Sequence, residues 1–349
     1  MTPERQRSIE RPQMTSSPRP GILVVTTKID ITADYVILAL REREAHFYRL
    51  NTEDLPLEAR SRFMVGAKSR SSTWEWTDAT GNCVDLSGVR SVWYRRHRLP
   101  ELSQELDSDL EDFCLRECQW FLRGALLARD VSWMSHPTAV SAAEAKPHQL
   151  AIASRIGFRV PHTLITNDAL AARDFHRRHR GRVVAKACRM GYIRRPTGNY
   201  SIYTTPVSQT DLQDEGAIHL APVIFQEHVD KACDLRVTVV GGTVFAARID
   251  SQSLPSAMTD WRRTESADLP HSRCDLPPQI ATKCRKLLTA LGLNFGAIDL
   301  VLDKTGSYYF LEINPSGQWA WIQDRLGFDI SGAIADWLVD AEGDRRGAA

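Results

Sequence analysis

Two apolar segments interrupted by acidic residues limit most strongly how this 349-residue chain can fold. They flank residues 303–306 (Asp-Lys-Thr-Gly), which is typical of a β-hairpin with a four-residue loop. With that loop, Leu302 would pair with Ser307, and Asp299 would face Phe310 across the two strands. The sequence therefore predicts an antiparallel hairpin over residues 295–314 in this register.

Three oxygen-bearing side chains of this hairpin would then converge. Glu312 would lie diagonal to Asp299 on one face of the sheet, and Asn314 follows two residues later. Two carboxylates and an amide oxygen suit a hard cation that keeps several waters and bridges phosphates, which describes Mg²⁺ better than Zn²⁺. The alternative is a hairpin with charges on its solvent-exposed face. It explains poorly why acids interrupt such apolar strands, because an unpaired buried carboxylate is costly.

Overall charge and cysteine content exclude several classes of protein. The chain has 44 basic and 43 acidic residues, so no global field favours nucleic acid or a membrane surface as partner. No apolar run approaches the length of a membrane-spanning helix, and residues 1–20 lack the apolar core of a secretory signal, so we expect a cytoplasmic location. The seven cysteines contain no Cys-x-x-Cys pair, which favours reduced thiols over disulfides or metal ligation.

The order of predicted strands and helices divides the chain into domains. Polar, Pro-rich residues 1–19 predict a disordered leader, and residues 341–349 predict a frayed tail. A strand–helix–strand unit opens residues 20–135, which we predict to be an α/β domain resembling half of a doubly wound fold. It lacks a Gly-x-Gly-x-x-Gly turn, so no dinucleotide site is expected there. Two α+β lobes follow, over residues 136–222 and 223–340.

Isolated basic residues suggest anion binding in the central part of the chain. Lys186 interrupts a strand of small apolar residues, and Lys146 lies in the second turn of a helix predicted to start at the capping box 141–144. The alternative for Lys186 is a solvent-facing edge position. The basic run 95–98 ends a predicted strand, where open α/β sheets place ligands, although such runs are also commonly just solvated. Both readings of that run stay open.

A second set of charged residues belongs to the predicted strand pair 234–250. By alternation Asp234 and Arg236 share one face of the first strand, while Arg248 comes from the return strand and Arg262 from a polar loop. Lysines on one lobe and acids on the other form a layout for holding a nucleoside triphosphate between lobes. The usual P-loop, Gly-x-x-x-x-Gly-Lys-Ser/Thr, is absent from the sequence.

An ordered succession of motifs resembles the ATP-grasp superfamily. It comprises Val-Val-Ala-Lys186, Phe-Gln-Glu227-His-Val, Asp234-Leu-Arg236-Val-Thr-Val-Val-Gly, Asp260-Trp-Arg262, Gly-Ala-Ile-Asp299 and Leu-Glu312-Ile-Asn314-Pro. More narrowly, Val-Trp93-Tyr-Arg-Arg96, Ser135-His136-Pro137 and Asn314-Pro-Ser-Gly-Gln-Trp-Ala-Trp321 resemble the ATP-grasp ribosomal peptide maturases, which are the graspetide synthetases related to microviridin ligases. The resemblance covers roughly residues 21–340.

This resemblance implies a fold, a reaction and partners. The fold would be ATP-grasp, with an N-terminal Rossmann-like pre-ATP-grasp α/β domain and two α+β lobes clamping ATP. The enzyme would be a ligase that uses ATP and Mg²⁺ to phosphorylate Asp or Glu carboxylates of a ribosomal precursor peptide. Ser, Thr or Lys side chains of that peptide would then close ω-ester or ω-amide rings. The peptide would carry a leader and a core, and the enzyme would be a homodimer.

Matching positions imply roles for individual residues. Lys146 and Lys186 would contact phosphates, the backbone of Glu227, His228 and Val229 would meet the adenine, and Gln226 and Asp234 would bind the nucleotide. Asp299, Glu312 and Asn314 would hold Mg²⁺, and Arg236, Arg248 and Arg262 would stabilise the transferring phosphoryl group and the oxyanion. One departure is that Lys186 is not followed by a Gly-Ser-rich loop, and no general base stands out. Two alternatives stay open: a ligase attaching a free amino acid or amine to a peptide or small acid, and a nucleotide-regulated peptide-binding protein without turnover.

Overall fold

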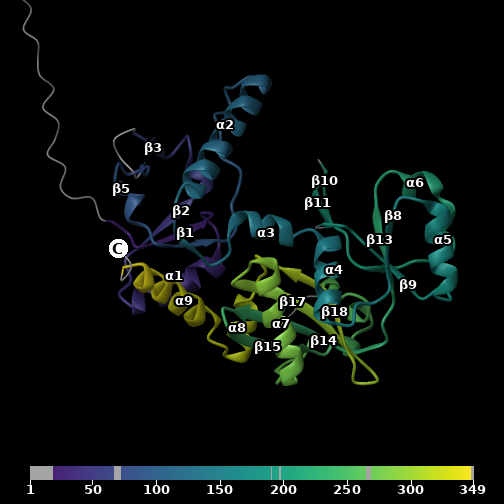
Figure 1. Cartoon of the computed structure of the whole chain (residues 1–349). Helices are drawn as coiled ribbons and strands as arrows, with labels where there is room; N and C mark the ends of the chain where they lie inside the picture. Colours follow the sequence, from purple (N-terminus) through teal and green to yellow (C-terminus); the bar gives the residue numbers. More distant parts are fainter. Residues whose placement is uncertain (1–18, 67–71, 190, 196–197, 265–268, 347–349) are drawn as a thin grey trace, which may run out of the picture.

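The computed structural model describes residues 19–66, 72–189, 191–195, 198–264 and 269–346. The predicted leader lies almost entirely outside these residues, as do the last residues of the predicted tail. Figure 1 shows the N-terminal domain at one end, the central lobe at the other and the C-terminal lobe between them. None of the described helices is long and apolar enough to cross a membrane.

The N-terminal domain is built on a parallel sheet in the order β2-β1-β6-β7. Asp30 starts the first helix because its side chain accepts hydrogen bonds from the backbone N–H groups of Thr32 and Ala33. A small antiparallel sheet and the projecting helix α2 complete the domain (Figure 1). The elements are β1 (Ile22–Thr26), α1 (Ile31–Glu42), β2 (Phe47–Asn51), β3 (Arg60–Met64), β4 (Thr73–Thr77), β5 (Cys83–Asp85), β6 (Ser91–Tyr94), α2 (Ser108–Leu127) and β7 (Ser132–Trp133).

The central lobe carries an antiparallel sheet in the order β12-β9-β13-β8. Helix α5 packs on this sheet through Ala172, which shares an apolar cluster with Val183 and Phe225. The elements are α3 (Pro137–Ala143), α4 (Lys146–Ile156), β8 (Thr163–Thr166), α5 (Ala169–Arg178), β9 (Val183–Lys186), β10 (Tyr192–Arg195), β11 (Gly198–Ser201), β12 (Thr205–Pro206), α6 (Glu215–His219) and β13 (Val223–Glu227).

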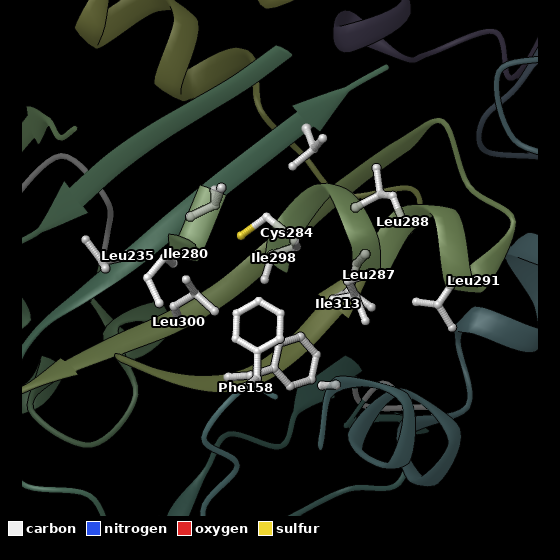
Figure 2. Packing of buried hydrophobic residues seen from close by; sticks show 14 of the residues in the cluster. Phe158, Leu235, Ile280, Cys284, Leu287, Leu288, Leu291, Ile298, Leu300 and Ile313 are labelled. Carbon is white, nitrogen blue, oxygen red and sulfur yellow. The ribbon is translucent and has the colours of Figure 1, made fainter. Parts of the chain in front are cut away.

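The C-terminal lobe is an antiparallel sheet in the order β16-β15-β14-β17-β18. One face is apolar, and Figure 2 shows Leu235, Ile298 and Leu300 of this face packing with Cys284 and Leu287 of helix α7. The opposite face of β14 and β17 carries the polar residues that the motifs singled out. The elements are β14 (Lys231–Val240), β15 (Thr243–Ile249), β16 (His271–Arg273), α7 (Pro278–Leu291), β17 (Phe295–Asp303), β18 (Tyr308–Asn314), α8 (Ala320–Leu326) and α9 (Ile330–Arg346).

The hairpin of β17 and β18 forms as predicted, but the predicted register is wrong. Leu302 pairs with Tyr308, and an irregularity after Asp299 leaves Asp299 directly opposite Glu312 rather than diagonal to it. The reason lies in the loop, where Asp303 Oδ1 accepts hydrogen bonds from the backbone N–H groups of Thr305 and Ser307. These bonds draw Ser307 into the turn, and the bulge then brings the two carboxylates closer together.

Three further expectations need correction. The capping box 141–144 starts no helix: α3 begins at Pro137 after the cap His136, so Lys146 is the first residue of α4. Strand β13 pairs with β8 and β9, so the central lobe extends beyond residue 222. The tail is not frayed over its described part, since α9 continues to Arg346 and packs on α1.

Candidate functional site

A cavity of about 410 Å³ lies between the central and C-terminal lobes. Its volume is within the usual range for small-molecule sites. Eleven of the thirteen predicted site residues line it: Lys146, Lys186, Gln226, Glu227, His228, Val229, Asp234, Arg262, Asp299, Glu312 and Asn314. The structure therefore gathers residues that are up to 168 positions apart in the chain, from 146 to 314, around one space.

Glu312 is the charged centre of this cavity. Its two oxygens pair with Lys146 Nζ at 2.9 Å and with Arg262 Nη1 at 3.4 Å. Burial alone would raise the pKa of Glu312, but attraction to Lys146 and Arg262 outweighs it and lowers the pKa to about 2. Glu312 is therefore an anion at neutral pH.

The acid and amide side chains of β17 and β18 fit a hard cation. Asp299 faces Glu312 directly, and Asn314 lies opposite Ala297, two positions along β17 on the same side of the sheet. All three side chains open into the cavity and offer only oxygen donors, if Asn314 presents its amide oxygen. Such a donor set suits Mg²⁺. Asn314 Oδ1 also accepts a hydrogen bond from the backbone N–H of Ser316 at 2.9 Å.

Lys186 approaches the same space from the end of β9. Its ammonium donates to Gln226 Oε1 at 2.6 Å, and Gln226 in turn donates to Thr163 Oγ1 at 2.9 Å. Desolvation, helped by the nearby positive charge of Lys146, lowers the pKa of Lys186 to about 8. An anion in the cavity would favour the charged form of this lysine.

Asp234 lies on the cavity wall in a cluster that the motifs did not reveal. Its Oδ2 accepts hydrogen bonds from Lys231 Nζ at 2.6 Å and from Ser251 Oγ at 2.5 Å. Burial raises the pKa of Asp234 despite these contacts. No sequence signal marked this contact, because residues i and i+3 lie on opposite faces of a regular strand. A bulge at Lys231/Cys233 brings Lys231 within reach of Asp234.

Arg262 is held rigidly by Asp260. Asp260 caps a short 3₁₀ turn (Trp261–Arg263) and accepts from Arg262 Nε at 2.9 Å and Nη2 at 2.8 Å. Burial opposes ionisation of Asp260, but this two-point contact prevails and lowers its pKa. The fork directs the remaining nitrogen, Nη1, toward Glu312.

The two other predicted arginines have different positions. Arg236 lies beneath the cavity, where Nη1 pairs with Asp299 Oδ1 at 2.9 Å. Arg248 is not brought to the site: it pairs with Leu235, whose side chain belongs to the apolar face of the sheet, whereas Arg236 belongs to the opposite face. The prediction for Arg248 is wrong because a residue of the return strand lies on the same sheet face as the residue that it opposes. Arg248 opposes Leu235 and not Arg236, so it lies on the apolar face.

A buried polar chain joins the N-terminal domain to this site. Arg95 Nε pairs with Asp30 at 2.9 Å, and Arg95 Nη2 donates to Gln318 Oε1 at 3.0 Å. The backbone oxygen of Gln318 accepts from Arg236 Nη2 at 3.1 Å. Of the basic run 95–98, Arg95 is therefore an internal structural residue, while Arg96 and Arg98 are exposed. Gln318 was missed because nothing local marks a contact over 223 residues.

Gly317 lies beside these contacts, at a position with no room for a side chain. A Cβ there would lie 2.4 Å from Ala297 Cβ and 2.8 Å from Arg236 Nη2. We expect Gly317→Ala to lower the free energy of unfolding by about 1–3 kcal/mol in a denaturant titration, because the packed neighbours must shift. Gly242→Ala is the control, since its Cβ would meet open space. Equal stability of the two variants would contradict this packing.

Comparison with known proteins agrees with this architecture. Residues 21–141 match the MvdD pre-ATP grasp domain family, and residues 211–338 match the RimK-like ATP-grasp domain family. Among solved structures, a RiPP-associated ATP-grasp ligase of Chryseobacterium gregarium in complex with ADP, and a leader and core peptide, is similar at 29% identity and a TM-score of 0.85, covering 91% of this chain and 96% of that one. Macrocyclase MdnC of Microcystis aeruginosa MRC, bound with precursor peptide MdnA, is similar at 31% identity and a TM-score of 0.82, covering 92% and 99%.

Curated relatives match only a part of the chain. Beta-citrylglutamate synthase B of Danio rerio and N-acetylaspartylglutamate synthase A of Homo sapiens are each 29% identical over 125 residues, which is 35% of this chain and 29% and 30% of those proteins. The chain thus matches less than a third of these relatives' length. In contrast, macrocyclase MdnB of Microcystis aeruginosa MRC is similar at 32% identity and a TM-score of 0.76. The match covers 91% of this chain and 98% of the MdnB chain. The chain adopts the ATP-grasp fold with a pre-ATP-grasp domain and belongs to the ATP-grasp ribosomal peptide maturases, the family of the graspetide synthetases and microviridin macrocyclases.

Proposed function

We propose that this protein is an ATP-dependent peptide macrocyclase. The observation that carries the proposal is the cavity between the lobes, where lysines of one side face the carboxylates of the β17–β18 hairpin. Its substrate would be a ribosomal precursor peptide with a leader and a core containing Ser or Thr and Asp or Glu. Similar proteins that were solved with ADP and with leader, core or precursor peptides support this choice.

The cavity residues would bind and orient ATP. Lys146 and Lys186 would neutralise phosphate oxygens, the backbone of residues 227–229 would contact the adenine, and Asp234 would lie on the nucleotide side. Asp299, Glu312 and Asn314 would hold Mg²⁺, which when bound neutralises the charge of the phosphates. Lys146 would then move from its ion pair with Glu312 toward a phosphate.

The reaction would proceed in two balanced steps. A carboxylate oxygen of a peptide Asp or Glu attacks the γ-phosphorus of ATP, and ADP leaves. A hydroxyl or amine of the same peptide then attacks the acyl carbon, the C–O bond to phosphate breaks and phosphate leaves. The proton of the attacking group passes to solvent, and the peptide has lost one water per ring. Arg262 and Arg236 would stabilise charge on the transferring phosphoryl group and on the tetrahedral oxyanion, because both guanidinium groups are fixed by carboxylates, Arg262 by Asp260 and Arg236 by Asp299 of the hairpin.

A ligase that attaches a free amino acid or amine is the second candidate. The partial match to synthases of N-acetylaspartylglutamate and β-citrylglutamate favours it. Mass spectrometry with ATP, Mg²⁺ and a short Thr- and Glu- or Asp-rich peptide encoded beside the gene separates the two. Cyclisation lowers the peptide mass by one water per bond, whereas ligation adds the mass of the amine less water. An unchanged peptide mass under conditions of full binding would refute both.

Affinity for ADP should depend on pH through Lys186. The ammonium form, which attracts phosphate, prevails below the pKa of about 8, and the neutral form prevails above it. In titrations with Mg²⁺ present, we expect the Kd for ADP to be nearly constant from about pH 7 to 8 and then to rise toward about tenfold per pH unit. Lys186→Met should bind weakly at every pH and lose this dependence. A wild-type Kd that stays constant to about pH 9.5 would contradict the assignment.

Homodimerisation stays a prediction from the resemblance, and a cytoplasmic location stays a prediction from the sequence. Sedimentation of the full chain tests the first: a single species with the mass of one chain at micromolar concentration would refute it.

A further inference from the structure

A second group of ligand-type side chains lies on the central lobe: two histidines that do not line the cavity, and Glu227 at its edge. His162, His179 and Glu227 each offer a ring nitrogen or a carboxylate oxygen, and these three atoms all lie within 4.8 Å of one another. Within the part of the chain that the structure describes, they form the group of three His, Cys, Asp or Glu side chains with metal-like spacing. None of the reaction steps above uses the two histidines.

Three secondary-structure elements fix this group. Glu227 ends β13 and His162 precedes β8, and the two strands pair so that the N–H of Glu227 donates to the carbonyl of His162 at 2.9 Å. The carboxylate of Glu227 also accepts from the N–H of His162 at 3.4 Å. The third residue, His179, is the C-cap of α5, and its ring contacts the ring of Phe175 at 4.4 Å between centroids. The sheet and the helix thus hold the three side chains together independently of any ligand.

We propose that His162, His179 and Glu227 bind a zinc ion. Two imidazoles and one carboxylate are a donor set that zinc uses in proteins, with bonds of about 2.0–2.2 Å and a remaining position for water. Rotation of the exposed His162 side chain and of the half-exposed His179 and Glu227 side chains would bring the three ligand atoms, which lie within 4.8 Å of one another, to the separations of a tetrahedral site. The nitrogen donors distinguish this site from the all-oxygen set of Asp299, Glu312 and Asn314, which suits Mg²⁺.

The electrostatic surroundings are compatible with a cation. His179 lies at the C-terminal end of α5, where the helix dipole favours positive charge. Arg182, which is close in sequence, is engaged elsewhere: its Nη2 pairs with Asp230 at 2.6 Å and donates to the carbonyl of His228. The site adjoins the cavity, because Glu227 begins the segment 227–229 that lines it. Zinc would therefore tie together β8, β13 and α5 at the start of this segment.

Metal titration of the full-length protein tests the site. Calorimetry with Zn²⁺ in the presence of excess Mg²⁺ should show one saturable zinc equivalent, because Mg²⁺ does not compete for imidazole nitrogen. We expect His162→Gln and His179→Ala each to weaken zinc binding by at least about tenfold. The control is His219→Ala, an exposed histidine of α6 in the same lobe, which should bind zinc as the wild type does. Circular dichroism of each variant checks that it is folded.

Thermal unfolding gives an independent readout. Zinc bound only by the folded state should raise the Tm of the wild type and of His219→Ala, and should raise the Tm of His179→Ala clearly less at the same zinc concentration. The proposal is overturned if the wild type shows no saturable binding, or if His179→Ala and His162→Gln bind zinc as tightly as the control. It is also overturned if several equivalents bind with equal affinity in all variants, since that is unspecific surface binding.

Discussion

Glu312→Gln is expected to lower ring formation by about 10³-fold while leaving binding of the precursor peptide nearly unchanged. The substitution preserves the shape of the side chain but removes the anion that Lys146 and Arg262 both contact. It also removes one of the three oxygen ligands proposed for Mg²⁺. Single-turnover mass spectrometry measures the rate, and fluorescence anisotropy with labelled peptide measures binding.

Two comparisons make the result for Glu312 decisive. Glu215→Gln alters an exposed carboxylate of the central lobe, which pairs with Arg173, and should react at the wild-type rate. ADP binding with Mg²⁺ should weaken in Glu312→Gln and not in Glu215→Gln. A Glu312→Gln variant that cyclises peptide at the wild-type rate would show that the carboxylate of Glu312 is not needed for ring closure.

Arg262→Lys should lower kcat by about 10²-fold with little change in the KM for ATP. Arginine reaches Asp260 through two nitrogens and Glu312 through a third, and this planar fork fixes where its charge lies. Lysine offers one nitrogen on a flexible stem, so it retains the charge but not the geometry. A catalytic role predicts a loss in kcat, whereas a role in ground-state ATP binding predicts a loss in KM.

Arg177→Lys provides the matched control for this loss. Arg177 is exposed on α5 and forms a surface ion pair with Asp174, three residues away, of a kind that contributes little to stability. Its replacement should leave kcat and KM unchanged. If Arg262→Lys also retains wild-type kcat, the Asp260–Arg262 pair is a structural element of the loop and the role proposed for Arg262 is wrong.

Local patterns in the sequence were sufficient to predict most of the fold and eleven residues that line the cavity. The apolar strands around 303–306 predicted the hairpin, and Lys186 was predicted to meet an anion because a charge among small apolar residues is otherwise costly; the structure places it on the cavity wall. These features depend on residues close together in the chain, where alternation and turn chemistry act directly. The ordered motifs then predicted the ATP-grasp fold, which the structure and its relatives confirm.

Features that depend on pairing between distant strands could not be predicted in the same way. A bulge that is visible only in the folded hairpin sets the register of Asp299 and Glu312. The sheet face of Arg248 likewise depends on its pairing with Leu235 of β14, which the sequence does not give. Gln318 carries no chemical signal of its own; its importance comes from lying between Arg95 and Arg236 in space. The start of the helix containing Lys146 was also predicted wrongly. Only two residues separate α3 from α4, so the sequence pattern did not reveal two separate helices.

Isotope transfer tests the central claim most directly. A precursor peptide whose Asp and Glu side-chain carboxylates carry ¹⁸O is incubated with the enzyme, ATP and Mg²⁺, and the released phosphate is analysed by mass spectrometry. Phosphorylation of a peptide carboxylate in the cavity between the lobes predicts one ¹⁸O atom in phosphate for each ring closed. Ring closure that releases phosphate without ¹⁸O would show that the carboxylate is never phosphorylated and would contradict the account.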